Sequence, residues 1–218
     1  LGNPEAADAL IGLLLLNNDR DVYLRHAAIM GLVGSSNKSA LARASKSTYR
    51  AARLGALLTY RRLQDPAVAN FLTDSDHSLV QEAARAIIGA NISKAFPALA
   101  ALSNQPDSLD YLLGLRVLNA HFRLGSKKDA QALAAFAANA NASDELRAEA
   151  VHHLSTWEHP PARDRVIGLF RPLPSRDVQA AKDALTSVFD TLLEAPEQVQ
   201  SKAIETATQL NLAPLTKN

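Results

Sequence analysis

Three histidines lie close together in the second half of the chain and could suggest metal binding. His152 and His153 are adjacent, and His159 follows a few residues later. Adjacent side chains on a helix point about 100° apart, so this pair does not readily chelate one ion. Glu149 lies one helical turn before His153, but a metal site needs more ligands than one such pair supplies. We predict no metal-binding residue and expect these histidines to form hydrogen bonds at the surface and between repeats.

Two pairs of acidic residues could suggest calcium binding or acid–base catalysis. They are Asp19 with Asp21, and Asp74 with Asp76. Neither pair is followed by the glycine and the distal glutamate of a calcium-binding loop. Both pairs occupy the same position in a repeated pattern, just before a helix. Aspartate at that position accepts hydrogen bonds from free backbone N–H groups, so we predict that these pairs cap helices.

The sequence offers no further catalytic or cofactor-binding motif. It contains 0 cysteines, which excludes disulfides, zinc–thiolate sites, iron–sulfur clusters, covalent c-type haem and cysteine nucleophiles. Gly-x-Ser-x-Gly, Gly-x-Gly-x-x-Gly and Gly-x-x-x-x-Gly-Lys are all absent. We therefore expect this segment to be non-enzymatic, with no catalytic residue and no cofactor.

A basic stretch could bind an anionic partner. From Val22 to Gln64 the chain has no aspartate or glutamate. One interpretation is a positive patch for an acidic protein, a polysaccharide, lipid head groups or nucleic acid. The alternative is a set of solvated helix faces, with some arginines paired to the aspartates of the turns. The candidate anion-binding or partner-binding residues are Arg43, Lys46, Arg50, Arg53, Arg61 and Arg62.

A proline-rich stretch around the single tryptophan interrupts the helical pattern. Pro160-Pro161 and Pro172-Leu173-Pro174 stop helices and favour an extended connection. Trp157 could contact a partner, because isolated tryptophans are frequent in binding hot spots. It could instead fill the gap where the loop folds over the helices. Arg163 and Arg165 are further candidate partner contacts, or they form local ion pairs with Asp164.

Composition favours closely packed helices. Of the 218 residues, 47% are hydrophobic and only 5% are aromatic, and alanine and leucine dominate. Both have high helix propensity, while the residues that strands favour are sparse. The net charge of +1 does not favour nucleic acid as a partner. No apolar run is long enough to span a membrane.

A repeated pattern supports this view. An apolar residue is followed by Arg or Gln and then by small residues, at a spacing of roughly 25 to 35 residues for most copies, which is typical of helical hairpins. A single hairpin cannot bury its apolar face, so such repeats must stack. The copies begin at Leu24-Arg25, Tyr49-Arg50, Val80-Gln81, Leu146-Arg147 and Val199-Gln200, with a degenerate copy at Leu112-Leu113.

The form Asp-x-Asp-x-x-apolar-Arg/Gln-x-x-Ala resembles the HEAT repeat. This resemblance implies an all-α fold, an α-solenoid of HEAT-like helical hairpins arranged as a right-handed α-α superhelix of about six pairs. We expect a single array over residues 1–218, with an irregular proline-rich insertion at about 157–176. The longest clean helix should run from about Arg176 to Glu194.

Several longer phrases resemble a narrower family, the PVC-type membrane-bound dehydrogenase and haem-binding proteins of bacteria. The resemblance covers roughly residues 1–212, which would be the HEAT region only. In that family, a propeller resembling sorbosone dehydrogenases precedes the array and a c-type cytochrome domain follows it. The phrases include Tyr60-Arg61-Arg62-Leu63-Gln64-Asp65-Pro66, Asn119-Ala120-His121-Phe122-Arg123-Leu124-Gly125 and Gly168-Leu169-Phe170-Arg171-Pro172-Leu173-Pro174.

The resemblance implies a periplasmic or secreted redox context but carries over no catalytic residue. Leu1 is not methionine and Asn218 is not an obvious terminus, so we expect a segment of a longer protein, which could be an oxidoreductase. We predict a non-catalytic interaction or scaffold module that binds neighbouring domains or another subunit. Two alternatives remain: an accessory segment that completes the active site of a neighbouring dehydrogenase-like domain, or a freestanding HEAT protein that binds an anionic partner.

Overall fold

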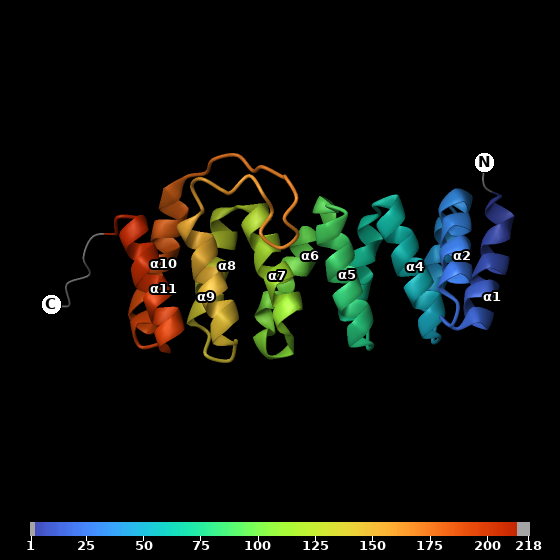
Figure 1. Ribbon diagram of the computed structural model, residues 1–218, viewed down its shortest axis with the longest axis horizontal. Coiled ribbons are helices and arrows are strands. Elements are labelled where there is room, and N and C mark those ends of the chain that lie inside the picture. The colour runs from blue at the N-terminus through green and yellow to red at the C-terminus, as the bar shows by residue number, and fades with distance from the viewer. Residues whose placement is uncertain (1–2, 213–218) are drawn as a thin grey trace. The chain divides into compact units, whose positions relative to one another are not determined.

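Helices account for the regular structure of the protein. The computed structural model describes residues 3–212 (Figure 1). Over this range the chain forms α-helices and short 3₁₀ helices, with no strand and a single antiparallel bridge between Arg163 and Phe170. The all-α class predicted from composition is therefore confirmed. None of the helices in this range is long and apolar enough to cross a membrane.

The chain divides between Ala95 and Phe96 into two compact units. In the first unit, α1 packs on α2, α3 packs on α4, and η2 packs on α5, so neighbouring elements pair along the chain. Its core includes Leu32, Leu57, Phe71 and Ile87. The elements are η1 (Pro4–Ala6), α1 (Ala7–Asn17), α2 (Val22–Ser35), α3 (Lys38–Ala44), α4 (Arg50–Leu63), η2 (Pro66–Thr73), α5 (His77–Gly89) and η3 (Ser93–Ala95).

The second unit also consists of paired helices. Helix α6 packs on α7, α8 on α9, and α10 on α11. Successive pairs touch, because α7 contacts α9, α9 contacts α11, and α8 contacts α10. The elements are α6 (Phe96–Ala100), η4 (Ala101–Asn104), η5 (Pro106–Ser108), α7 (Tyr111–Leu124), α8 (Lys127–Ala138), α9 (Asp144–Ser155), α10 (Val178–Leu193) and α11 (Glu197–Gln209).

The prediction that both aspartates of each pair cap a helix is confirmed for Asp21 and Asp76, whereas Asp19 and Asp74 bind arginines instead. The Asp21 carboxylate accepts a hydrogen bond from the N–H of Tyr23 (2.8 Å) at the start of α2. The Asp76 carboxylate accepts one from the N–H of Ser78 (2.9 Å) at the start of α5. These bonds satisfy N–H groups that have no partner within the first helical turn.

Two segments differ from a regular α-helix. The element η2 is a 3₁₀ helix over its whole length. The stretch from Ser93 to Asn104 alternates between 3₁₀ and α geometry. Pro97 lies in this stretch and has no N–H to donate to the preceding turn, which favours such a break. The prediction for the longest helix is confirmed, since α10 has 16 residues.

Residues 156–177 join α9 to α10 without helix, and we call them the connector (orange in Figure 1). Its two ends are held together, because the N–H of Arg176 donates to the carbonyl of Glu158 (3.0 Å). Within it, residues 162–171 double back on themselves, and we call them the connector hairpin. Here the N–H of Arg171 donates to the carbonyl of Ala162 (2.8 Å). The connector is therefore an ordered loop closed by its own backbone.

Candidate functional site

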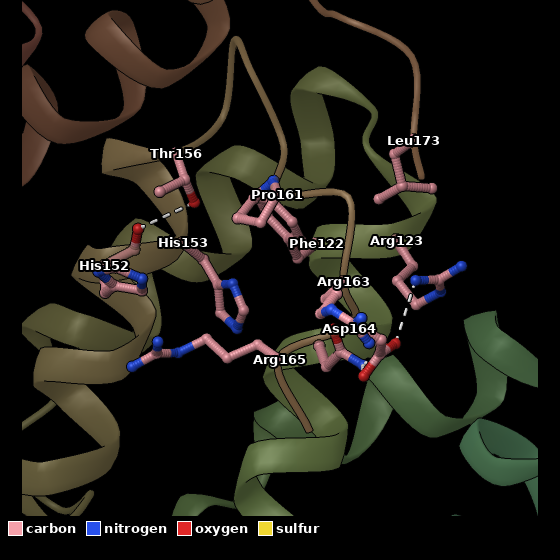
Figure 2. A pocket seen from close by; sticks show the side chains of 11 residues that line it. Phe122, Arg123, His152, His153, Thr156, Pro161, Arg163, Asp164, Arg165 and Leu173 are labelled. Atoms are coloured by element: carbon pink, nitrogen blue, oxygen red, sulfur yellow. Dashed lines mark hydrogen bonds and ion pairs between the residues drawn. The ribbon is translucent and has the colours of Figure 1, made fainter. Parts of the chain in front are cut away.

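A cavity of about 250 Å³ lies between α7, α9 and the connector. Figure 2 shows that its side chains come from all three segments and that the connector closes one side. Helix α7 contributes an amide, a ring and a guanidinium, and α9 contributes two histidines. The lining residues are Asn119, Phe122, Arg123, His152, His153, Thr156, Pro161, Arg163, Asp164, Arg165 and Leu173.

Trp157 anchors the first turn of the connector in the core. Its indole is only 1% exposed and meets the Phe122 ring edge-on at 6.1 Å between centroids. The Arg176 guanidinium lies over both rings, 4.6 Å from each centroid. Burial, followed by the nearby charge of Arg123, lowers the pKa of Arg176 below its ordinary value. These contacts fix both ends of the connector against α7.

Asp164 fixes the connector hairpin to α7. Its side chain is fully buried and accepts hydrogen bonds from the Asn119 amide and from Arg123 Nη1, both at 3.1 Å. It also accepts the backbone N–H groups of Val166 (2.9 Å) and Ile167 (3.1 Å). The carboxylate therefore pairs with a buried cation and holds the turn of the hairpin at the same time. Such a pair resists disruption, because removing one charge leaves the other buried and uncompensated.

His153 lies at the bottom of the site and is neutral near pH 7. It is 1% exposed and stacks on the Phe122 ring at 4.6 Å. Burial lowers its pKa from 6.5 to about 4, because the charged imidazolium loses its hydration, although the nearby Glu149 carboxylate opposes this shift. Burial and the charge of Arg165 likewise lower the pKa of His152.

Glu149 and Arg165 form an ion pair across the gap between α9 and the connector. Arg165 Nη2 donates to Glu149 Oε2 at 3.0 Å, and Arg165 Nε donates to Oε1. Burial acts to raise the pKa of Glu149, but the hydrogen bonds from Arg165 and the proximity of His153 outweigh it, so its pKa lies below the ordinary value. This two-point pairing gives the hairpin a second attachment to the helices.

Two buried nitrogens of the site have no hydrogen-bond partner within the described range. They are Arg123 Nε and His153 Nε2. Glu149 Oε1 lies 3.8 Å from His153 Nε2, which is too far for a hydrogen bond. Arg123 also lies 5.9 Å above the Phe96 ring, which compensates part of its burial. Both nitrogens belong to residues that line the cavity.

Metal binding finds no support in this part of the molecule. Over residues 3–212, no cluster of three or more His, Cys, Asp or Glu side chains could hold a metal ion. His152 and His153 have ring centroids 6.4 Å apart and tilted by 49°. The two rings therefore do not face a common point.

Most of the basic stretch is paired to acidic residues of the turns and helices. Arg43 pairs with Asp8 at 2.6 Å, and Arg50 pairs with both Asp19 and Asp76.

Arg53 binds Asp74 through two nitrogens at 2.8 and 3.1 Å, and Arg61 binds Glu82 at 3.0 Å. Lys46 and Arg62 are exposed and form no ion pair with another residue of the range 3–212. The structure thus shows the turn pairing that the sequence left open as one alternative.

Two of the six basic residues proposed as anion-binding candidates line the same groove. A groove of about 510 Å³ in the first unit is lined by Arg61 and Arg62, together with Arg25 and His26. Arg43, Lys46, Arg50 and Arg53 do not line it. Because Arg25 is paired with Asp19 and Arg61 with Glu82, much of the charge in this groove is already balanced.

The three other candidates lie in and beside the cavity of the second unit. Arg163 and Arg165 line it, whereas Trp157 is buried behind Phe122 and offers no surface to a partner. Sequence reasoning missed Arg123 and the role of His153. One signal could have identified the first: Asn119 and Arg123 are polar residues one turn apart on α7, and both bind Asp164.

No model of a known protein family matches the chain. No curated protein matches it either.

Proposed function

We propose that this chain is a non-catalytic binding module built from HEAT-type helical hairpins. The repeated packing and capping of the helices support this proposal. Elements pair along the chain in both units, and aspartates at the same repeat position cap α2 and α5. In the second unit, α7, α9 and α11 contact one another in sequence order, as neighbouring hairpins of a solenoid do. Stacking of hairpins supplies the rigid frame that a scaffold requires.

One observation carries the binding role: the connector hairpin exposes large apolar side chains on a fixed backbone. Phe170 is 70% exposed and Leu169 is 51% exposed. Arg163 forms the antiparallel bridge with Phe170, and Arg165 lies in the turn between them. Aromatic residues and arginine are enriched in protein interfaces and in their energetic hot spots. An exposed aromatic on a loop therefore favours a protein partner over a purely structural role.

The attachments of the hairpin make this surface suitable for recognition. Asp164 ties the hairpin to α7, and Arg165 ties it to Glu149 on α9. A loop that is already ordered loses less conformational entropy when a partner binds. The hairpin can therefore present Phe170 without a folding cost at the moment of association.

We place this module in an exported redox protein, where it would hold a neighbouring domain or another subunit at a fixed position. This context follows from the likeness of its phrases to the HEAT region of PVC-type dehydrogenase and haem-binding proteins. The expected partners are a sorbosone dehydrogenase-like propeller and a c-type cytochrome domain, and the expected compartment is the periplasm or the exterior.

Site-specific photo-crosslinking tests this proposal. A benzophenone amino acid placed at position 170, in the natural full-length protein expressed in its own cell, should crosslink to a redox domain that mass spectrometry then identifies. The matched control is position 204 on α11, because Ile204 is 48% exposed in the same unit. Equal crosslinking from positions 170 and 204, or none from position 170, would refute the hairpin as the docking element.

A further inference from the structure

We propose that the cavity between α7, α9 and the connector binds a monocarboxylate with a compact apolar body. The inference rests on the proposed function as a binding module and adds a ligand class to it. It concerns the cavity, whereas the docking role above concerns the exposed surface of the hairpin.

The size of the cavity sets the scale of the ligand. Its volume of about 250 Å³ corresponds to about eight water molecules in the liquid. Pockets for drug-sized molecules begin at roughly 300 Å³. A small aromatic or branched acid therefore fits, whereas a nucleotide does not.

The charge around the cavity selects an anion of low charge. Three arginines line it, namely Arg123, Arg163 and Arg165. Asp164 balances one of them, and Glu149 balances another. One positive charge is left over, because His153 is neutral near pH 7. A single carboxylate complements this surplus, whereas a multiply charged phosphate would exceed it.

Arg163 supplies the available cation. Its Nη1 donates to the carbonyl of Gly168 at 3.0 Å, and its side chain forms no ion pair with another residue of the range 3–212. By contrast, Asp164 and Glu149 each bind an arginine. An incoming carboxylate would therefore meet a free guanidinium edge and two acids that are already neutralised.

The two unpartnered nitrogens give the site its second recognition element. A buried donor without an acceptor costs roughly 1–3 kcal/mol, so native structures usually provide a partner, an ion or a ligand. Arg123 Nε always carries a proton. The Glu149 carboxylate, 3.8 Å from His153 Nε2, favours the tautomer in which that nitrogen is also protonated. Both nitrogens can then donate to ligand oxygens.

The remaining lining is apolar and fits the body of the ligand. Phe122 lies on α7, while Pro161 and Leu173 come from opposite ends of the connector. In Figure 2, Pro161 and Leu173 extend from the connector and Phe122 extends from the helix. Contact with them would stabilise a ring or a branched chain through burial of apolar surface. The combination of an apolar body and one carboxylate satisfies both parts of the lining.

Isothermal titration calorimetry at pH 7.5 tests the proposal with benzoate as the probe. The full chain should bind benzoate, and benzamide, which has the same shape without the charge, should bind at least tenfold more weakly. Short peptides ending in leucine with a free carboxylate or with an amide test a partner's chain end as the source of this group. Tighter binding of the free-acid peptide than of benzoate would assign the site to a chain end, and the reverse would assign it to a small molecule.

Two variants and one control separate recognition from folding. Arg163→Gln removes an exposed cation and should weaken benzoate binding about tenfold, the usual effect of losing one charge-assisted hydrogen bond. His153→Phe keeps a ring against Phe122 and should weaken binding through the lost nitrogen. Arg85→Gln on α5 removes an exposed arginine outside the cavity and should change nothing.

Three results would overturn the proposal. They are equal binding of benzoate and benzamide, an unchanged affinity in Arg163→Gln, and no heat of binding up to about 10 mM benzoate, a concentration well above the range of specific ligands. None of these results would affect crosslinking from position 170. Failure of the ligand class and failure of the docking role are therefore distinguishable.

Discussion

Replacement of His153 should remove about 2 kcal/mol of the acid sensitivity of the second unit. The imidazole has a pKa of about 4 in the folded chain and 6.5 as its ordinary value. As the pH falls below 6.5, His153 binds a proton in the unfolded chain but stays neutral in the folded chain. The stability that neutral His153 contributes is therefore present above pH 6.5 and is lost progressively between pH 6.5 and 4.

The size of the effect follows from the two pKa values. Each unit of difference corresponds to about 1.4 kcal/mol once the pH lies below both. Between pH 7.5 and pH 5, most of the proton uptake by the unfolded chain has occurred and little by the folded chain. The free energy of unfolding should fall by about 2 kcal/mol over this range because of His153 alone.

Urea denaturation followed by circular dichroism at several pH values measures this loss. His153→Gln keeps a polar side chain but cannot titrate, so its stability should fall by about 2 kcal/mol less than that of the natural protein. His159→Gln, on the exposed part of the connector, is the matched control and should keep the full loss. If His153→Gln loses as much stability as the natural protein, burial of this imidazole is not the cause.

Two further substitutions test how the connector is held. Asp164→Ala leaves the buried Arg123 without its carboxylate, so it should lower the free energy of unfolding by about 3 kcal/mol in urea denaturation; a loss below about 1 kcal/mol would contradict the pairing described above. Gly125→Ala places a Cβ 2.9 Å from Arg176 Nη1 at a φ of +70°. It should lower the free energy of unfolding by about 1–2 kcal/mol. It should also shift the fluorescence of the single tryptophan, Trp157, to longer wavelength. Gly168→Ala is the control, because its φ of +69° is equally strained but its Cβ would meet nothing within 4 Å; an equal fluorescence shift in both variants would contradict displacement of Arg176.

Local sequence signals predicted the helices and their caps well. Asp21 and Asp76 directly precede apolar-periodic segments, and the hydrogen bonds of a cap form within three residues, so no distant contact decides them. The length of α10 was also predictable, because no proline or glycine interrupts residues 178–193. The 3₁₀ geometry of η2 was not, since both helix types use the same residues in so short a segment.

The candidate site was predictable only in part. Arg163 and Arg165 were singled out by their place in a proline-rich break, and both line the cavity. Nothing in their spacing indicates that Arg165 pairs with Glu149, which is 16 residues earlier in the chain. The neutral state of His153 depends on burial by groups from other segments, which no local pattern records.

The sequence by itself determined an all-helical chain, the positions of its capped turns and the place where the helical pattern breaks. Each of these depends on interactions within a few residues, so composition and periodicity suffice. Tertiary structure alone decided that the break folds back over α7 and α9, with Asp164 and Arg176 holding it there. That outcome depends on charges and rings that are up to 54 residues apart in sequence, as from Phe122 to Arg176. Their burial becomes favourable only when all of them assemble together.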